Sequence, residues 1–200
     1  MKRILLFLFI ISLSIALLSC SKKDNKELAE NEFKISGNAS LNLEIKKLEE
    51  TIKSAQTDVE RAGIYTKIAV INSEKGDINA LIKSAAEAIK YQPNQYMSHY
   101  LLGKSYITAG RLNDAVASLE TAISLKNDFA PAYFEMGNAL YKKYSYPGAK
   151  ENYRKAIMLD KNMIDAYNNL GVLSTITGDL AAAEKNLKQC LTLNPDYAKA

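Results

Sequence analysis

Few residues in this 200-residue chain could take part in nucleophilic or metal chemistry. The chain has one histidine, His99, and two cysteines, Cys20 and Cys190. A structural zinc site needs four Cys or His ligands and a three-histidine catalytic site needs more imidazoles, so we expect no metal site and no cofactor. His99 lies beside Ser98 and near Ser105, but there is no glycine-rich phosphate loop, no paired-histidine helix and no evident triad. We therefore expect no enzymatic activity.

Cys20 follows a segment with the features of a secretory signal peptide. Lys2 and Arg3 precede fifteen uncharged residues, 4–18. As a helix these would rise about 22 Å, less than the roughly 30 Å of a bilayer's hydrocarbon core. A basic start, an apolar stretch of this length and a small residue before the break predict a signal peptide over residues 1–19. Its removal would lower the formal charge from +4 to +2.

Residues 17–20, Leu-Leu-Ser-Cys, resemble the lipobox of bacterial lipoproteins. The resemblance implies that Cys20 is the lipidation site: it receives a diacylglyceryl thioether, becomes the N-terminus after cleavage and is N-acylated. Several acyl chains, at ~0.8 kcal/mol per buried CH₂, hold a protein at a membrane where one chain is marginal. The alternative is an ordinary cleaved signal with a chance cysteine. Ser21 is not the Asp associated in some bacteria with inner-membrane retention, so the expected location is the bacterial cell envelope, at the outer membrane.

A polar tether and one helix are expected next. Eight of the thirteen residues 22–34 are charged, too polar a composition to offset the entropy of ordering, so residues 20–40 are predicted to be a flexible tether. Ser40 is a plausible N-cap for an amphipathic helix over residues 41–57. The whole chain holds 25 Ala and 24 Leu against 4 Val, a balance that favours helix over sheet.

The rest of the chain repeats itself every 34 residues. Four windows align without a gap: 62–95, 96–129, 130–163 and 164–197. The eighth place is always small: Ala69, Gly103, Gly137 and Gly171. The fourth place holds Tyr65, His99, Tyr133 and Tyr167, and the twenty-seventh Ala88, Ala122, Ala156 and Cys190. His99 and Cys190 are therefore expected to be packing residues rather than a base and a nucleophile.

This pattern resembles the tetratricopeptide repeat (TPR), a helix–turn–helix unit of 34 residues. The resemblance implies an all-α fold, an α-solenoid of four TPR units preceded by one amphipathic helix. Small residues at fixed places let the two helices of a unit approach closely. Gly76, Gly110 and Gly178 stand at the turn between those helices, and Tyr144 takes that place in the third window.

The resemblance further implies a concave groove, lined by the first helix of each unit, that binds an extended peptide or a partner helix. Aromatic rings supply contact area there, and Asn can hydrogen-bond a peptide backbone. The alternative is that some of these rings pack against the neighbouring repeat. The residues expected to line the groove are Thr66, Tyr100, Lys104, Phe134, Asn138, Tyr141, Asn168 and Asn169.

One subclass of the family holds a C-terminal carboxylate with Lys and Asn. Asn138 and Asn169 stand at two of the Asn places, but Phe134 occupies the place of the expected Lys. The clamp is therefore incomplete, and binding of a chaperone tail is not favoured.

These observations predict a non-catalytic, lipid-anchored adaptor that docks another envelope protein. Basic residues are scattered among acidic ones, so no nucleic-acid partner is expected. The alternative is a structural lipoprotein that self-assembles into a homo-oligomer by stacking through an uncapped helix over residues 180–193, because the sequence ends at Ala200 without a polar capping helix.

Overall fold

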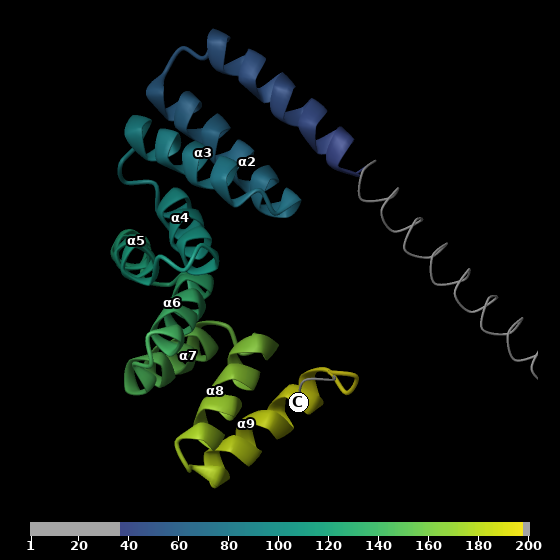
Figure 1. The fold of residues 1–200 in the computed structure, drawn as a ribbon, viewed down its shortest axis with the longest axis vertical. Coiled ribbons are helices and arrows are strands. Elements are labelled where there is room, and N and C mark those ends of the chain that lie inside the picture. The colour runs from purple at the N-terminus through teal and green to yellow at the C-terminus, as the bar shows by residue number, and fades with distance from the viewer. Residues whose placement is uncertain (1–36, 198–200) are drawn as a thin grey trace, which may run out of the picture. The chain divides into compact units, whose positions relative to one another are not determined.

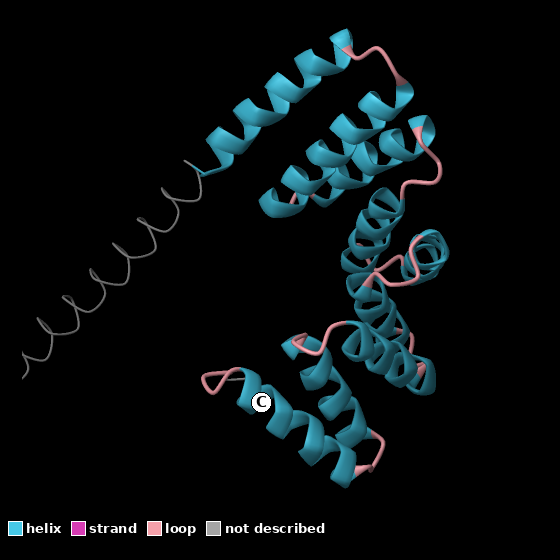
Figure 2. Ribbon diagram, turned by 180° about the vertical axis from the view of Figure 1, so that it is seen from behind, coloured by secondary structure: helices cyan, strands magenta, loops and turns pink. Residues whose placement is uncertain are grey.

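The computed structural model describes residues 37–197, and all regular elements in that range are helices (Figure 2). The first covers residues 37–54, and the others are α2 (Asp58–Lys75), α3 (Ile78–Tyr91), α4 (Tyr96–Thr108), α5 (Leu112–Leu125), α6 (Ala130–Lys142), α7 (Tyr146–Leu159), α8 (Ile164–Ile176) and α9 (Leu180–Leu193). The chain divides into two compact units after Lys47, and α2 to α9 all belong to the second. The predicted all-α fold is confirmed. The predicted signal peptide, Cys20 and most of the predicted tether lie outside the described residues.

The helix expected over residues 41–57 differs at both ends. Residues 37–40 are already helical, so Ser40 lies inside the helix and is not its N-cap. The helix ends at residue 54, because Thr57 caps the following helix instead of continuing this one. Its side-chain oxygen accepts from the Glu60 backbone N–H at 3.2 Å, and the Glu60 carboxylate accepts from the Thr57 backbone N–H at 3.2 Å. This reciprocal capping box fixes the start of α2.

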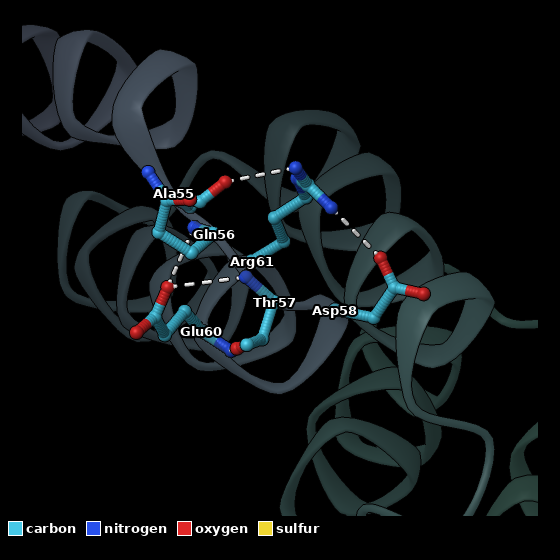
Figure 3. A network of polar contacts seen from close by, with 6 residues as sticks. All are labelled: Ala55, Gln56, Thr57, Asp58, Glu60 and Arg61. Atoms are coloured by element: carbon cyan, nitrogen blue, oxygen red, sulfur yellow. Dashed lines mark hydrogen bonds and ion pairs between the residues drawn. The ribbon is translucent and has the colours of Figure 1, made fainter.

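Further contacts hold the same junction together (Figure 3). The Glu60 carboxylate also accepts from the Gln56 backbone N–H at 2.7 Å. Arg61 donates to the Ala55 carbonyl at 2.8 Å and pairs with Asp58 at 2.9 Å (Figure 3). Together these bonds satisfy backbone groups that a helix end leaves unpaired.

The helices of the second unit pack in chain order (Figure 1). α2 packs on α3, α4 on α5, α6 on α7, and α8 on α9, and each such pair also contacts the next. The first helices of consecutive pairs meet as well, α2 with α4 and α4 with α6. Helices α4, α6 and α8 begin at residues 96, 130 and 164, which are the first residues of three windows of the repeat. No helix among residues 37–197 is both long and apolar enough to cross a bilayer.

Glycines at the eighth place let the two helices of a unit meet closely. A Cβ on Gly103 would lie 2.5 Å from Leu119 Cγ, and one on Gly137 would lie 2.5 Å from Tyr153 Cε1. Both distances are far inside van der Waals contact, so only glycine allows this packing. The partner at the twenty-fourth place therefore sits directly over the glycine of its own unit.

The four turns inside the units have one backbone conformation. Gly76, Gly110 and Gly178 have φ values of 73°, 74° and 78°, and Tyr144 has φ 60°. At each turn the N–H of the next residue closes a bond to the carbonyl five residues back, as from Ser145 to Leu140 at 2.9 Å. This left-handed conformation costs a non-glycine residue about 1–2 kcal/mol, so Tyr144 adopts it only because the turn requires it.

Candidate functional site

A pocket of about 390 Å³ opens between the first helices of the last three units and α7. Four of the residues predicted to line a groove lie here: Asn138, Tyr141, Asn168 and Asn169. The full lining is Ile107, Asn138, Tyr141, Lys142, Tyr153, Asn168, Asn169 and Val172. The pocket thus combines three side-chain amides with apolar and aromatic walls.

The three amides form a continuous hydrogen-bonded row across two units. Asn168 Nδ2 donates to Asn169 Oδ1 at 3.2 Å, and Asn169 Nδ2 donates to Asn138 Oδ1 at 2.9 Å. Asn138 Nδ2 in turn donates to the Glu135 carboxylate at 3.0 Å. Because Asn138 lies on α6 and the other two on α8, the row joins the third unit to the fourth.

Tyr153 supports this row from the second helix of its unit. The residue is buried in α7, and its hydroxyl donates to Asn138 Oδ1 at 2.8 Å. Burial raises the pKa of the Tyr153 hydroxyl, so the group remains a neutral donor at physiological pH. Asn138 Oδ1 therefore accepts two hydrogen bonds, one from Tyr153 and one from Asn169.

Sequence reasoning missed both Tyr153 and Glu135. The expected groove positions all lie on the first helix of a unit, whereas Tyr153 lies on α7, the second helix of the third unit. A signal was present: the twenty-fourth place holds Ala85, Leu119 and Leu187 in the other windows, and only the third has a side chain with a polar end. Glu135 stands at the sixth place of its window, the place that Asn169 takes in the fourth, so the expected role of Asn169 was a signal for Glu135 as well.

Charge around the pocket is mixed. Glu135 is only partly exposed, and burial raises the pKa of its carboxyl, while its bond from Asn138 and the nearby Lys104 lower it. Lys142 lines the pocket with an exposed side chain. Tyr141 lines the wall next to Lys142, with its ring 6.0 Å from that of Tyr146.

The other predicted groove residues do not line this pocket. The Thr66 hydroxyl lies 2.6 Å from Gln95 Oε1, inside a local polar cluster. The Tyr100 ring packs edge-on to Phe129 at 5.1 Å, and burial raises the pKa of Tyr100 to about 12. Phe129 closes the same window as Tyr100, but Tyr100 also packs against an apolar cluster that includes Ala132 and Met136 of the next repeat.

Two further predicted residues lie near the pocket without lining it. The Phe134 ring lies 5.9 Å from the ring of Tyr153 and belongs to the same apolar cluster. Lys104 is exposed on α4, close enough to Glu135 to lower its pKa. The groove role of these two residues stays a prediction.

The remaining chemistry-bearing residues have structural partners. His99 Nε2 lies 2.7 Å from the Pro93 carbonyl. Cys190 is buried, its thiol donates to the Ile164 carbonyl at 3.5 Å, and burial raises its pKa. Within residues 37–197, no group of three or more His, Cys, Asp or Glu side chains is placed to hold a metal ion.

Helix pairs with a 34-residue spacing, close glycine contacts and left-handed turns define a TPR solenoid. Residues 104–143 match the family model described as TPR repeat, and residues 164–197 match the one described as Tetratricopeptide repeat. These two segments therefore carry tetratricopeptide repeats.

Two curated proteins illustrate its relatives. Hsp70-Hsp90 organizing protein 3 of Arabidopsis thaliana is 27% identical over 175 residues, which cover 82% of this chain and 31% of that protein. Protein O-mannosyl-transferase TMTC3 of Homo sapiens is 32% identical over 123 residues, which cover 60% of this chain and 13% of the transferase. The chain thus matches less than a third of the length of either relative.

Solved structures share the fold. The crystal structure of MamA has a TM-score of 0.70 at 21% identity and covers 82% of this chain and 94% of its own. The first TPR of Spaghetti (RPAP3), solved bound to the HSP90 peptide SRMEEVD, has a TM-score of 0.59 at 18% identity, covering 61% of this chain and 97% of its own. At these identities the likeness shows the fold alone.

Proposed function

We propose that this chain is a non-catalytic TPR adaptor that binds an extended segment of another cell-envelope protein on the face formed by α4, α6 and α8. The observation that carries the proposal is the pocket at Asn138, Asn168 and Asn169. It offers side-chain amides and an aromatic wall on the first helices of consecutive units, a surface suited to a peptide. The peptide-bound TPR among the solved neighbours supports the same kind of ligand.

Affinity capture from membranes of the source organism tests the binding face. Val172 lines the pocket and is 39% exposed, and Leu125 at the end of α5 is 40% exposed and does not line it. We expect Val172→Arg to remove the partner from the captured set, because a long cation fills the pocket mouth. Leu125→Arg adds the same charge at a matched exposure and should leave the captured set unchanged. Equal partner sets from the two variants would contradict the binding face.

We further propose that Cys20 anchors the adaptor to a bacterial envelope membrane, with the outer membrane as the favoured location. The support is the signal-like segment 1–19 followed by the lipobox-like residues 17–20. Mass spectrometry of the mature chain tests this. A chain that begins at an acylated Cys20 agrees with the proposal, and one that begins at Ser21 or upstream of Cys20 contradicts it.

A second candidate function is self-assembly through α9. One observation favours it: the α9 side chains of Leu180 and Leu191 are exposed, Leu180 at 68%. Sedimentation of the chain across the micromolar range separates the two candidates. A monomer at all concentrations contradicts self-assembly, and Leu180→Lys should dissolve any oligomer that forms through this helix.

A further inference from the structure

The row of amides in the pocket has a fixed direction. Its first member beyond Asn138 is the Glu135 carboxylate, which when ionised has only acceptors. Asn138 must therefore turn its Nδ2 toward Glu135 and its Oδ1 toward Tyr153 and Asn169. The orientation of an amide group is assigned from its hydrogen-bond partners. The orientation of Asn138 therefore also fixes the orientations of Asn169 and Asn168. Asn169 presents Nδ2 to Asn138 and Oδ1 to Asn168.

Because the row runs in this direction, the acceptor at its far end, Asn168 Oδ1, has no partner within the row. Asn168 donates its Nδ2 to Asn169, so its Oδ1 faces away from the row, and this buried oxygen has no hydrogen-bond partner in the structure. Asn168 is 7% exposed and lines the pocket. An unpaired buried acceptor of this kind destabilises the protein, and a ligand that donates an N–H or O–H group to it would remove that penalty. Ser174 Oγ is also buried and unpaired, but Ser174 does not line the pocket.

The number of donors and acceptors restricts which group fits. A carboxylate brings no donor and would be repelled by the unpaired Asn168 oxygen. An ammonium group brings donors but no acceptor, so it could not accept from the amides that line the pocket. A neutral group that donates and also accepts suits the site, because each amide of the row donates one N–H within the row and keeps a second N–H for a ligand.

We propose that the pocket binds the primary carboxamide of a Gln or Asn side chain carried by the partner segment. The carboxamide N–H donates to Asn168 Oδ1, its oxygen accepts from the free N–H groups of the row, and its methylenes lie against Ile107 and Val172. A side chain fits better than a backbone amide, because the acceptor is buried at the pocket wall and a main chain would bring both neighbouring residues with it. This inference rests on the proposed binding face and adds the chemistry that the face selects.

Nuclear magnetic resonance with small probes tests the chemistry directly. The ¹⁵N-labelled full chain in detergent micelles is titrated with N-acetyl-glutamine N-methylamide and, separately, with the isosteric N-acetyl-glutamate N-methylamide. We expect the glutamine probe to shift the side-chain NH₂ signals of Asn168 and Asn169 and to bind about tenfold more tightly, the ratio given by one hydrogen bond in place of one repulsive contact. Equal or tighter binding of the glutamate probe would overturn the proposal, as would the absence of any shift with both probes.

Two variants and a control keep the test selective. Asn168→Leu removes the acceptor and should abolish the preference for glutamine over glutamate, without lowering the melting temperature. Val172→Arg, which leaves the amide row intact, should block both probes. Asn186→Leu is the matched control, since Asn186 on α9 donates its Nδ2 to Ala182 and does not line the pocket. An unchanged glutamine preference in Asn168→Leu overturns the role of Asn168.

The outcome also separates this inference from the proposed function. Loss of partner capture in Val172→Arg together with no glutamine preference would leave the binding face standing and remove only the carboxamide. Partner capture that survives Val172→Arg would remove the binding face itself, whatever the probes do.

Discussion

The second and third units share one packing contact, but the side chain that makes it has a different role in each. In both, a glycine at the eighth place lies under the side chain at the twenty-fourth place: Gly103 under Leu119, and Gly137 under Tyr153. Leu119 ends in the apolar core between α5 and its neighbours. Tyr153 fills the same space and then extends its hydroxyl to Asn138 on the face of the pocket. A repeat can therefore keep its fold and still change its binding face through a residue on the second helix.

The largest expected effect comes from removing the glycine of the third unit. Gly137→Ala should lower the free energy of unfolding by about 1–3 kcal/mol, because the new methyl group would overlap the buried Tyr153 ring, which its bond to Asn138 holds in place. Chemical denaturation measures this. The control is Gly63→Ala in α2, where nothing lies within 4 Å of the added Cβ. That variant should gain about 0.5–1 kcal/mol, and a stable Gly137→Ala protein would contradict the packing shared by the two units.

Removing only the hydroxyl makes the third unit resemble the second. Tyr153→Phe should cost about 0.5–1.5 kcal/mol, since Asn138 Oδ1 loses one of its two donors. It should also weaken binding of the glutamine probe, because the orientation of Asn138 is then held by fewer bonds. Tyr144→Phe, at a side chain that is 79% exposed, serves as the control and should change neither quantity. Unaltered stability and binding in Tyr153→Phe would mean that Tyr153 acts only as filler.

The turn of the third unit offers a smaller effect of opposite sign. Tyr144→Gly should raise the free energy of unfolding by about 0.5–1 kcal/mol, because glycine adopts φ near 60° without strain. The greater conformational freedom of glycine in the unfolded chain offsets part of this gain. Gly110→Ala at the matching turn of the second unit should do the reverse. Thermal melts of both variants measure the pair. A loss of stability in Tyr144→Gly would show that the contact between Tyr144 and Tyr146, at 6.3 Å, outweighs the strain.

The smallest expected effect concerns pH. Burial raises the pKa of the Glu135 carboxyl above its ordinary value. The folded state therefore binds the proton more tightly than the unfolded state, and the stability from this group is complete below the ordinary pKa and lost as pH rises through the raised pKa. We expect the Glu135→Gln variant to be more stable than the parent at pH 7. Its free energy of unfolding should also change less with pH between the ordinary carboxyl pKa and the raised pKa of Glu135. The exposed Glu151→Gln controls for net charge, and a parallel pH profile in the two variants would contradict the account.

Local patterns in the sequence predict the fold well and the site only in part. The 34-residue spacing is visible directly in the sequence, so the helix pairs and the place of Asn138 and Asn169 on the first helices of their units could be predicted from it. The hydrogen-bonded row of amides could not be predicted, because it depends on the Tyr153 hydroxyl reaching Asn138 from α7 and on which way each amide turns, and both are tertiary features. The end of the first helix was misplaced because Thr57 had two available roles, and the capping box with Glu60 decided between them.

Site-specific photo-crosslinking in cells of the source organism tests the central claim most directly. A photoreactive phenylalanine analogue is placed at Val172, on the pocket, or at Leu125, at nearly equal exposure outside it. The account predicts a partner adduct from Val172 whose cross-linked peptide contains Gln or Asn, and no such adduct from Leu125. The same adduct from both positions, or from Leu125 alone, would contradict a binding face built on α4, α6 and α8.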